Sequence, residues 1–336
     1  MKPNIKNRAI SAFTVVELIL VVAVIAILAT VTIVAYNGAQ QNAHKSAILS
    51  DLDNSSAILA HDINVNGTYP ATVAAADGGR GLPTNSGTTY QYTVNNTNTL
   101  KTFCLTATQG TQSYYITQDS SPFPGICPIL YFDAGISTSY PGTGTNWADL
   151  SGNGNNGTLI NGVGYDSANG GALLFDGLND YVSVLSALNQ TPSNQAWSVN
   201  AAVKLVSTAP SGTQQLVNLD LGANLSWYST NKLLLYLNSG TNDYYDYGNF
   251  NLKDDKWHIV TFVFQNSTGR REIYIDGVDV STTGPNLTST PSGIPATLTI
   301  GTTLSGKIGD FRLYDRALSP ADVSQIYTAL RGRYGI

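Results

Sequence analysis

Glu17 is chemically the most unusual residue of this sequence, because it is the only charged side chain in the apolar run from Phe13 to Ala35. An ionised carboxylate costs about 3 kcal/mol at the centre of a bilayer, and it persists there when a partner neutralises it. The next cation along the chain is Lys45. The sequence therefore predicts a positively charged partner for Glu17.

A second set of side chains with binding chemistry lies in the stretch NDYYDYGNF, residues 242–250. Sugar rings stack on aromatic faces, and their hydroxyls exchange hydrogen bonds with amides and carboxylates. The candidate ligand-binding residues are Asp243, Tyr244, Tyr245 and Tyr247. An edge strand whose tyrosines alternate into the core is the other interpretation.

Motifs for catalysis are missing from the sequence. It contains no G-x-S-x-G, H-E-x-x-H or C-x-x-C, and its three histidines are dispersed. Glycosidases need paired carboxylates, whereas residues 129–336 hold a single glutamate, Glu272. We expect a protein that is not an enzyme, with His44 and His61 solvated and His258 packed or in a structural hydrogen bond.

The stretch GNGNNG, residues 152–157, satisfies the pattern G-x-G-x-x-G of dinucleotide-binding sites. Such a site needs the pattern on a turn that leads from a strand into a helix. No helix is expected after residue 157, so we interpret the stretch as a turn.

Composition indicates a β-rich chain. Only 12% of the 336 residues are charged, 42% are hydrophobic, and the formal net charge is −5. Abundant Gly, Asn, Ser, Thr and Tyr favour strands and turns over soluble helices. Nonspecific nucleic-acid binding depends on excess Lys and Arg, so we expect no nucleic-acid partner.

The apolar run is long enough to cross a membrane. As a helix it covers about 34 Å at 1.5 Å per residue. A cleavable secretory signal would have a shorter apolar core of about 7–15 residues. The basic residues ahead of it, Lys2, Lys6 and Arg8, favour a single-pass orientation with the N-terminus in the cytoplasm. The helical pattern continues to residue 66, and Gly67 with Pro70 predicts its end.

The stretch SAFTVVELILVVAVIAILA, residues 11–29, resembles the type III signal of type IV pilins and pseudopilins. The resemblance implies a leader of residues 1–12, cleavage by prepilin peptidase between Ala12 and Phe13, and N-methylation of the new terminus. It implies a helix over 13–66 that first spans the cytoplasmic membrane and then packs against other pilin subunits in an extracellular pilus. Glu17 would then pair with the terminal amine of a neighbouring subunit.

Three residues depart from the pilin pattern. Ala12 stands where the family usually has glycine, which bears on how efficiently the peptidase cuts. Ala26 and Val34 stand where many pilins have a helix-breaking glycine and proline. We therefore expect the part of the helix that melts in some pilus filaments to stay helical here.

Residues 67–128 are predicted to form a small β domain, called the head below. Three alternating runs, TTYQYTV, KTFCLTAT and SYYIT, indicate a meander of short strands. An exported chain meets an oxidising compartment, so Cys104 and Cys127 are expected to form a disulfide, with two unpaired buried thiols as the alternative. The region resembles the compact β head of a pilin.

Residues 129–336, called the sandwich below, contain many short alternating runs and predict two packed antiparallel sheets. The Asp-Gly pair in IDGV, residues 275–278, predicts a type I′ hairpin. A final helix is expected to begin after Ser319 and to end at Gly332.

Four motifs of the sandwich resemble the LamG-like jellyroll domains of the concanavalin A-like group: DLSGNGNNGTL, GGALLFDGLNDYVSV, KWHIVTFVF followed by YIDGV, and GKIGDFRLYDRALSPADV. Some members of that group hold calcium, which prefers several oxygen ligands. The resemblance makes six residues candidate metal ligands: Asp149, Asn153, Asn155, Asp176, Asp180 and Asp310. The alternative is that they shape turns by hydrogen bonding to the backbone.

The sequence thus predicts an α+β chain with a long N-terminal pilin helix, a disulfide-bonded β head and an all-β jellyroll. The leading hypothesis is a type IV pilus subunit, minor or at the tip, that displays the jellyroll for adhesion to a glycan or another surface receptor. The alternative is a membrane-anchored surface protein, or a pseudopilin of a secretion or DNA-uptake machine, whose jellyroll is purely structural. Calcium is the only cofactor that the sequence suggests.

Overall fold

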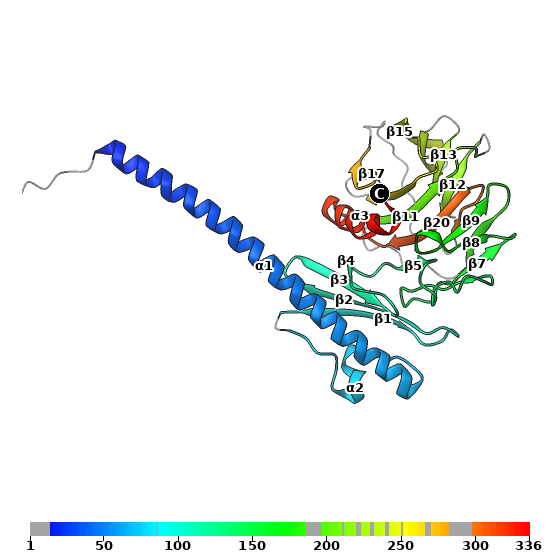
Figure 1. Cartoon of the computed structure of the whole chain (residues 1–336), viewed down its shortest axis with the longest axis horizontal. Helices are drawn as coiled ribbons and strands as arrows, with labels where there is room; N and C mark the ends of the chain where they lie inside the picture. Colours follow the sequence, from blue (N-terminus) through cyan, green and yellow to red (C-terminus); the bar gives the residue numbers. More distant parts are fainter. Residues whose placement is uncertain are drawn as a thin grey trace, which may run out of the picture. The chain divides into compact units, whose positions relative to one another are not determined.

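The computed structural model describes residues 14–336 except residues 86, 186–195, 210–211, 220–222, 229–231, 239–241, 250, 266–269 and 282–297. For residues 223, 227–228, 232–238 and 242–249 it describes the backbone alone. The chain divides into two compact units, Met1–Ala47 and Ile48–Ile336. A long helix is followed by sheets, as Figure 1 shows, and the chain contains a disulfide, which confirms the predicted α+β class.

The long helix α1 extends from Val15 to Asn66. Its residues up to Asn42 are exposed, whereas Ile48, Leu52 and Leu59 in its second half are fully buried. The helix is continuous past Ala26 and Val34, where neither glycine nor proline interrupts it. It ends as predicted at Gly67, which has φ +71° and donates its N–H to the carbonyl of Ile63.

The head contains one four-stranded antiparallel sheet in the order β1-β2-β3-β4. Its elements are η1 Val73–Ala75, α2 Ala76–Gly79, β1 Thr89–Asn95, β2 Thr102–Gln109, β3 Gln112–Thr117 and β4 Phe123–Pro124. The three predicted strands are present, and the short β4 adds a fourth. Phe103, Leu105 and Ile116 form its core together with Leu52 and Leu59 of α1.

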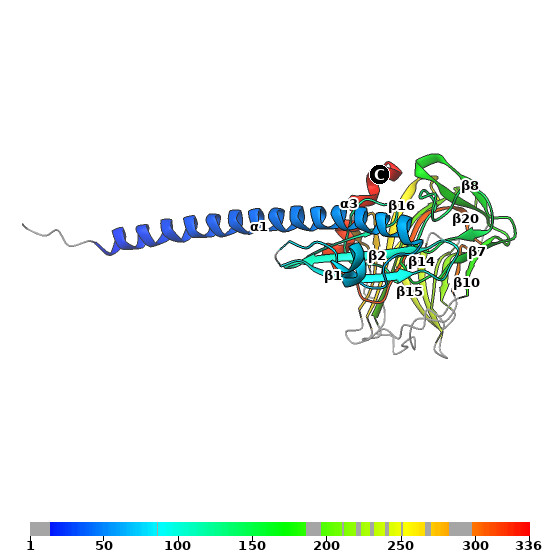
Figure 2. The same cartoon turned by 90° about the horizontal axis from the view of Figure 1, so that it is seen from below.

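The sandwich consists of two eight-stranded antiparallel sheets, seen from a second side in Figure 2. One has the order β15-β14-β13-β12-β19-β10-β7-β6, and the other β18-β17-β16-β11-β20-β9-β8 with β5 paired to β20. The bounds are β5 Leu130–Asp133, β6 Asn146–Trp147, β7 Gly157–Ile160, β8 Gly164–Asp166, η2 Ala168–Gly170, β9 Ala172–Asp176, β10 Tyr181–Val184, β11 Ala196–Leu205, β12 Gln214–Leu219, β13 Ala223–Tyr228, β14 Lys232–Asn238, β15 Asn242–Asn249, β16 Trp257–Gln265, β17 Arg270–Ile275, β18 Val278–Asp279, β19 Leu298–Ile300, β20 Ser305–Tyr314 and α3 Pro320–Tyr334. Inward-facing aromatic and branched residues of both sheets, such as Trp197, Phe262 and Phe311, fill one core.

The predicted hairpin is confirmed, since Asp276 and Gly277 both have positive φ and connect β17 to β18.

The predicted end of α3 at Gly332 is wrong, because the helix extends to Tyr334 and Gly335 is its C-cap. Tyr334 is buried, and its ring centroid lies 4.6 Å from that of Trp257. This packing keeps the chain helical through Gly332 despite the low helix propensity of glycine. The predicted cap is confirmed, since Ser319 accepts the N–H of Asp322 in a capping box.

Candidate functional site

Glu17 lies in the first turn of α1 and is bonded within that turn. Its Oε2 accepts hydrogen bonds from the backbone N–H and the hydroxyl of Thr14, both at 2.8 Å. Among the described residues, no cationic side chain forms an ion pair with it. The predicted processing residues Ala12 and Phe13 lie outside the described residues. By length and composition, α1 meets the requirements of a membrane-spanning helix.

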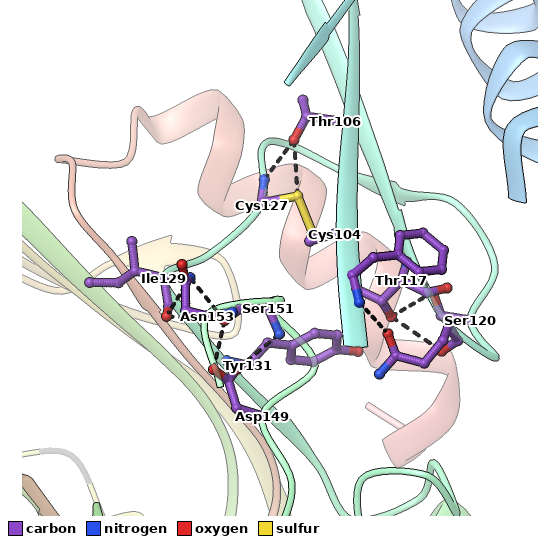
Figure 3. Close-up of a disulfide and its surroundings, with 12 residues drawn as sticks. Cys104, Thr106, Thr117, Ser120, Cys127, Ile129, Tyr131, Asp149, Ser151 and Asn153 are labelled. Carbon is purple, nitrogen blue, oxygen red and sulfur yellow. Dashed lines mark hydrogen bonds between the residues drawn. A yellow bond between two sulfur atoms is a disulfide. The ribbon is translucent and has the colours of Figure 1, made fainter. Parts of the chain in front are cut away.

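The structure confirms the disulfide between Cys104 of β2 and Cys127, which Figure 3 shows. The N–H of Cys127 donates to the hydroxyl oxygen of Thr106 at 2.9 Å, and that hydroxyl lies 3.1 Å from the Cys127 sulfur. Cys127 is followed at once by the sandwich, whose Ile129 N–H donates to the carbonyl of Leu313 in β20. The bridge therefore ties the second strand of the head to the entry of the sandwich.

Head and sandwich share packed side chains around Arg312 of β20. Its guanidinium lies 3.6 Å from the ring centroid of Phe123 in β4 and 4.5 Å from that of Tyr131 in β5. The guanidinium also pairs with Asp310 at 2.7 Å, and both side chains are buried. Cys104 belongs to the same buried cluster as Tyr131. Because these groups come from both regions, Ile48–Ile336 behaves as one body.

The first three metal candidates form one turn of the sandwich. The Asp149 carboxylate accepts the backbone N–H groups of Tyr131 and Ser151 at 3.0 and 2.9 Å and the Ser151 hydroxyl at 2.8 Å (Figure 3). It also accepts the backbone N–H of Asn155 at 2.9 Å. Burial raises the pKa of Asp149, and these hydrogen bonds oppose the rise. Asn153 donates through Nδ2 to the carbonyl of Ile129 at 3.0 Å. These contacts are those of a turn held by its own side chains.

Asp176 and Asp180 share the turn between β9 and β10. The Asp180 Oδ2 accepts the N–H of Asp176 at 3.1 Å, and the Asp176 Oδ1 accepts that of Leu178 at 2.8 Å. The hydrogen bond from Leu178 lowers the pKa of Asp176, whereas burial raises that of Asp180. The other oxygen of Asp180 is buried without a hydrogen-bond partner among the described residues.

The sixth metal candidate, Asp310, lies in the core and not in a turn. Burial raises its pKa to about 6, although Arg312 opposes this. The structure thus places the six candidates at three positions, and within its described ranges no three His, Cys, Asp or Glu side chains gather as a metal set. Calcium binding by these residues remains a prediction.

The candidate glycan residues Asp243, Tyr244, Tyr245 and Tyr247 belong to β15, the last strand in its sheet order. Only the backbone of this strand is described, so the prediction about their side chains lies outside the described residues.

His258 forms the structural hydrogen bonds that the sequence predicts. Its Nδ1 lies 2.8 Å from Asp276 Oδ2, and its Nε2 lies 3.2 Å from Asp254 Oδ1. Burial alone would lower the pKa of His258, but the two carboxylates outweigh it and raise the pKa. His258 thereby joins the start of β16 to the β17–β18 hairpin.

Sequence reasoning missed a groove that the head and sandwich form together. It contains Thr97, Asn98, Thr99 and Leu100 from the loop between β1 and β2, and Asn146 and Asn156 from the sandwich. The sequence indicates only that this loop connects two strands. No local pattern pairs it with residues some fifty positions away, so nothing short of the fold could have identified the groove.

Comparison with known proteins agrees with the fold. A family described as the concanavalin A-like lectin/glucanases superfamily matches residues 175–324. No curated protein matches the chain.

Solved structures similar to the chain include the binding domain of Paraclostridial Mosquitocidal Protein 1, with 14% identity, a TM-score of 0.49, and coverage of 60% of this chain and 52% of that one. The binding domain of botulinum neurotoxin DC in complex with rat synaptotagmin II has 17% identity, a TM-score of 0.48, and coverage of 61% and 52%. The chain thus spans about half the length of these structures. Because residues 175–324 match this family and the sandwich contains two eight-stranded sheets, the sandwich is a concanavalin A-like jellyroll.

Proposed function

We propose that this chain is a type IV pilin-like subunit, cleaved by prepilin peptidase between Ala12 and Phe13, that carries its jellyroll on a pilus for adhesion to a glycan or another surface receptor. It occupies a minor or tip position, because a sandwich of this size on every subunit would crowd a filament.

One feature of α1 carries this proposal. Its first half is an exposed apolar helix whose single charge is Glu17, and the described residues supply no cation for that charge. A bilayer accommodates the apolar surface but leaves the carboxylate uncompensated. The terminal amine of a neighbouring subunit, exposed by cleavage close to Glu17, neutralises it when the helices pack.

A binding role for the jellyroll, and not a catalytic one, is supported by the state of its only glutamate. The two carboxylate oxygens of Glu272 accept hydrogen bonds from Arg270 Nε and Nη2 at 2.5 and 2.6 Å, and the Tyr274 hydroxyl donates to one of them at 2.5 Å. A general acid or nucleophile must reach its substrate, whereas this carboxylate is held by its own strand.

The assembly proposal is tested with Glu17→Gln and Glu17→Ala in cells that make the filament. We expect both variants to remain in the membrane fraction and to be missing from sheared surface filaments. Asp53→Asn is the matched control, because Asp53 is an exposed carboxylate on the same helix, and it should assemble normally. Filaments containing either Glu17 variant at the wild-type level would refute the proposal.

The alternative of a membrane-anchored protein or pseudopilin is favoured by the length of the apolar half of α1, which is sufficient for an anchor by itself. It predicts that the protein stays attached to the cell and binds no glycan. The full chain in detergent, applied to a glycan array with and without a calcium chelator, separates the two functions. Loss of binding with the chelator would support the calcium prediction at the same time.

A further inference from the structure

The glycine-rich turn 152–157 contacts the head. Gly152 and Gly154 both have positive φ, and a Cβ on Gly152 would lie 2.6 Å from the carbonyl oxygen of Thr93 in β1. A Cβ on Gly154 would lie 2.0 Å from the side-chain nitrogen of Asn95. Glycine is therefore required twice for the turn to approach the head closely. This is the structural role of the pattern that resembled a dinucleotide motif.

The loop of the head that this turn meets is held by asparagines. Asn95 Oδ1 accepts the N–H groups of Thr97 and Asn98 at 3.1 and 3.0 Å. Asn96 pairs with both backbone groups of Tyr69, accepting at 3.0 Å and donating at 2.9 Å. Asn98 Nδ2 donates to the carbonyl of Gly154 at 3.3 Å. Because the loop is already ordered, a ligand that binds it meets a lower entropy cost.

Two hollows flank this loop and share the residues Thr99 and Leu100. The larger, of about 590 Å³, lies towards Asn146 and Asn156 of the sandwich. The smaller, of about 320 Å³, lies towards Tyr69, Gln118 and Thr138, and its lining includes the charged residues Lys101 and Asp119. Both volumes lie in the range of about 300–1,000 Å³ that is typical of small-ligand pockets.

The larger hollow is lined by amides and hydroxyls and holds no charged side chain. Asn156 Oδ1 accepts the N–H of Asp149 at 3.0 Å, and its Nδ2 has no partner among the described residues. Asn146 is exposed. Leu100 adds a small apolar surface between the two hollows. Amides that donate and accept around an apolar contact suit the hydroxyls and C–H faces of a sugar.

The smaller hollow adds two polar atoms whose hydrogen bonds are unmade. Gln118 is 6% exposed, and its Oε1 accepts the N–H of Phe103 at 3.1 Å while its Nε2 has no partner. The hydroxyl of Thr138, from the sandwich, also has none among the described residues. A buried polar group without a partner is destabilising, and both residues belong to the lining of the smaller hollow.

We propose that the two hollows form one groove that binds a neutral saccharide. This rests on the adhesive function proposed above and assigns that function to the junction of head and sandwich. The larger hollow holds no charged side chain, and in the smaller hollow the opposite charges of Lys101 and Asp119 leave no net positive charge for sialic acid or sulfate. The net charge of −5 disfavours anionic glycans further. Buried side chains of both regions pack together around Arg312 at this junction.

Binding of chitohexaose, cellohexaose and mannohexaose to the full chain in detergent, with sialyllactose and heparin as anionic probes, tests the groove. We expect at least one neutral probe to bind more tightly than either anionic probe. Thr99→Arg, at an exposed position between the hollows, should weaken that binding by about tenfold or more. Asn146→Ala should weaken it by about threefold to tenfold. The matched controls Thr328→Arg and Asn54→Ala, both at exposed helix positions outside the groove, should bind within about twofold of the wild type.

The outcomes separate this site from the wider proposal. If both groove variants bind the probe as tightly as the wild type, the proposed site is wrong. Adhesion through another surface of the jellyroll then remains the proposal. A preference for the anionic probes overturns the neutral saccharide. No binding of any probe by the wild type overturns the saccharide altogether, and the pilin-like assembly is then judged by the Glu17 variants alone.

Discussion

The two halves of α1 share one continuous backbone but have opposite surroundings. In the first half, Leu20, Ile25 and Leu28 are about 60% exposed. In the second half, Ile48, Leu52 and Leu59 are fully buried against the head. Apolar surface on this scale is rarely left in water. The second half has its partner within the chain, whereas the first half has no packed partner among the described residues. Under the function proposed above, its partner is a bilayer before assembly and neighbouring helices afterwards.

The largest effect is expected from Arg312→Ala, which tests whether the head and the sandwich are stabilised as one body. The substitution leaves Asp310 buried without its partner and removes the contact with Phe123. We expect the free energy of unfolding, measured by denaturant titration of the full chain in detergent, to fall by about 3–5 kcal/mol. Arg331→Ala, at an exposed position of α3, is the control. A loss below about 0.5 kcal/mol for Arg312→Ala would show that head and sandwich are not coupled there.

A matched pair of leucines addresses the two halves directly. Leu52→Ala removes a fully buried side chain and should lower the free energy of unfolding by about 2–5 kcal/mol. Leu20→Ala removes an exposed one and should change it by less than about 0.5 kcal/mol. The same denaturant titration measures both. Equal effects of the two substitutions would contradict the difference in burial between the two halves of α1.

The smallest expected effect is a pH-dependent change in the free energy of unfolding of the unit Ile48–Ile336. The folded pKa of His258 lies above its usual 6.5, so its contribution to stability is complete below that value and is lost as the pH rises through the folded pKa. We therefore expect His258→Gln to destabilise the protein more at about pH 5.5 than at about pH 9. Unfolding titrations of both proteins at each pH measure the difference, and a deficit that is the same at both would contradict the role of Asp254 and Asp276.

The sequence was sufficient for features that depend on nearby residues. The apolar run ahead of Lys45, the Asp276–Gly277 hairpin and the Ser319 cap each follow from a pattern only a few residues long. The end of α3 could not be located in this way, because burial of Tyr334 against Trp257 overrides the local preference of Gly332.

The junction could not be predicted for a related reason. Arg312 meets Phe123, and Asn98 meets Gly154, across long separations in the chain. Periodicity shows that a strand has an inner face but not which side chain of another region it will contact. The groove depends on such contacts, so its residues could be identified only from the folded structure, in which the head and the sandwich are in contact.

Intact-mass measurement of this protein in sheared surface filaments shows whether residues 1–12 are removed before the helix packs. We expect a mass that begins at an N-methylated Phe13 and lacks residues 1–12. A surface form that retains residues 1–12 would contradict the proposal that the first half of α1 is stored in the membrane and then released by cleavage to pack in a filament.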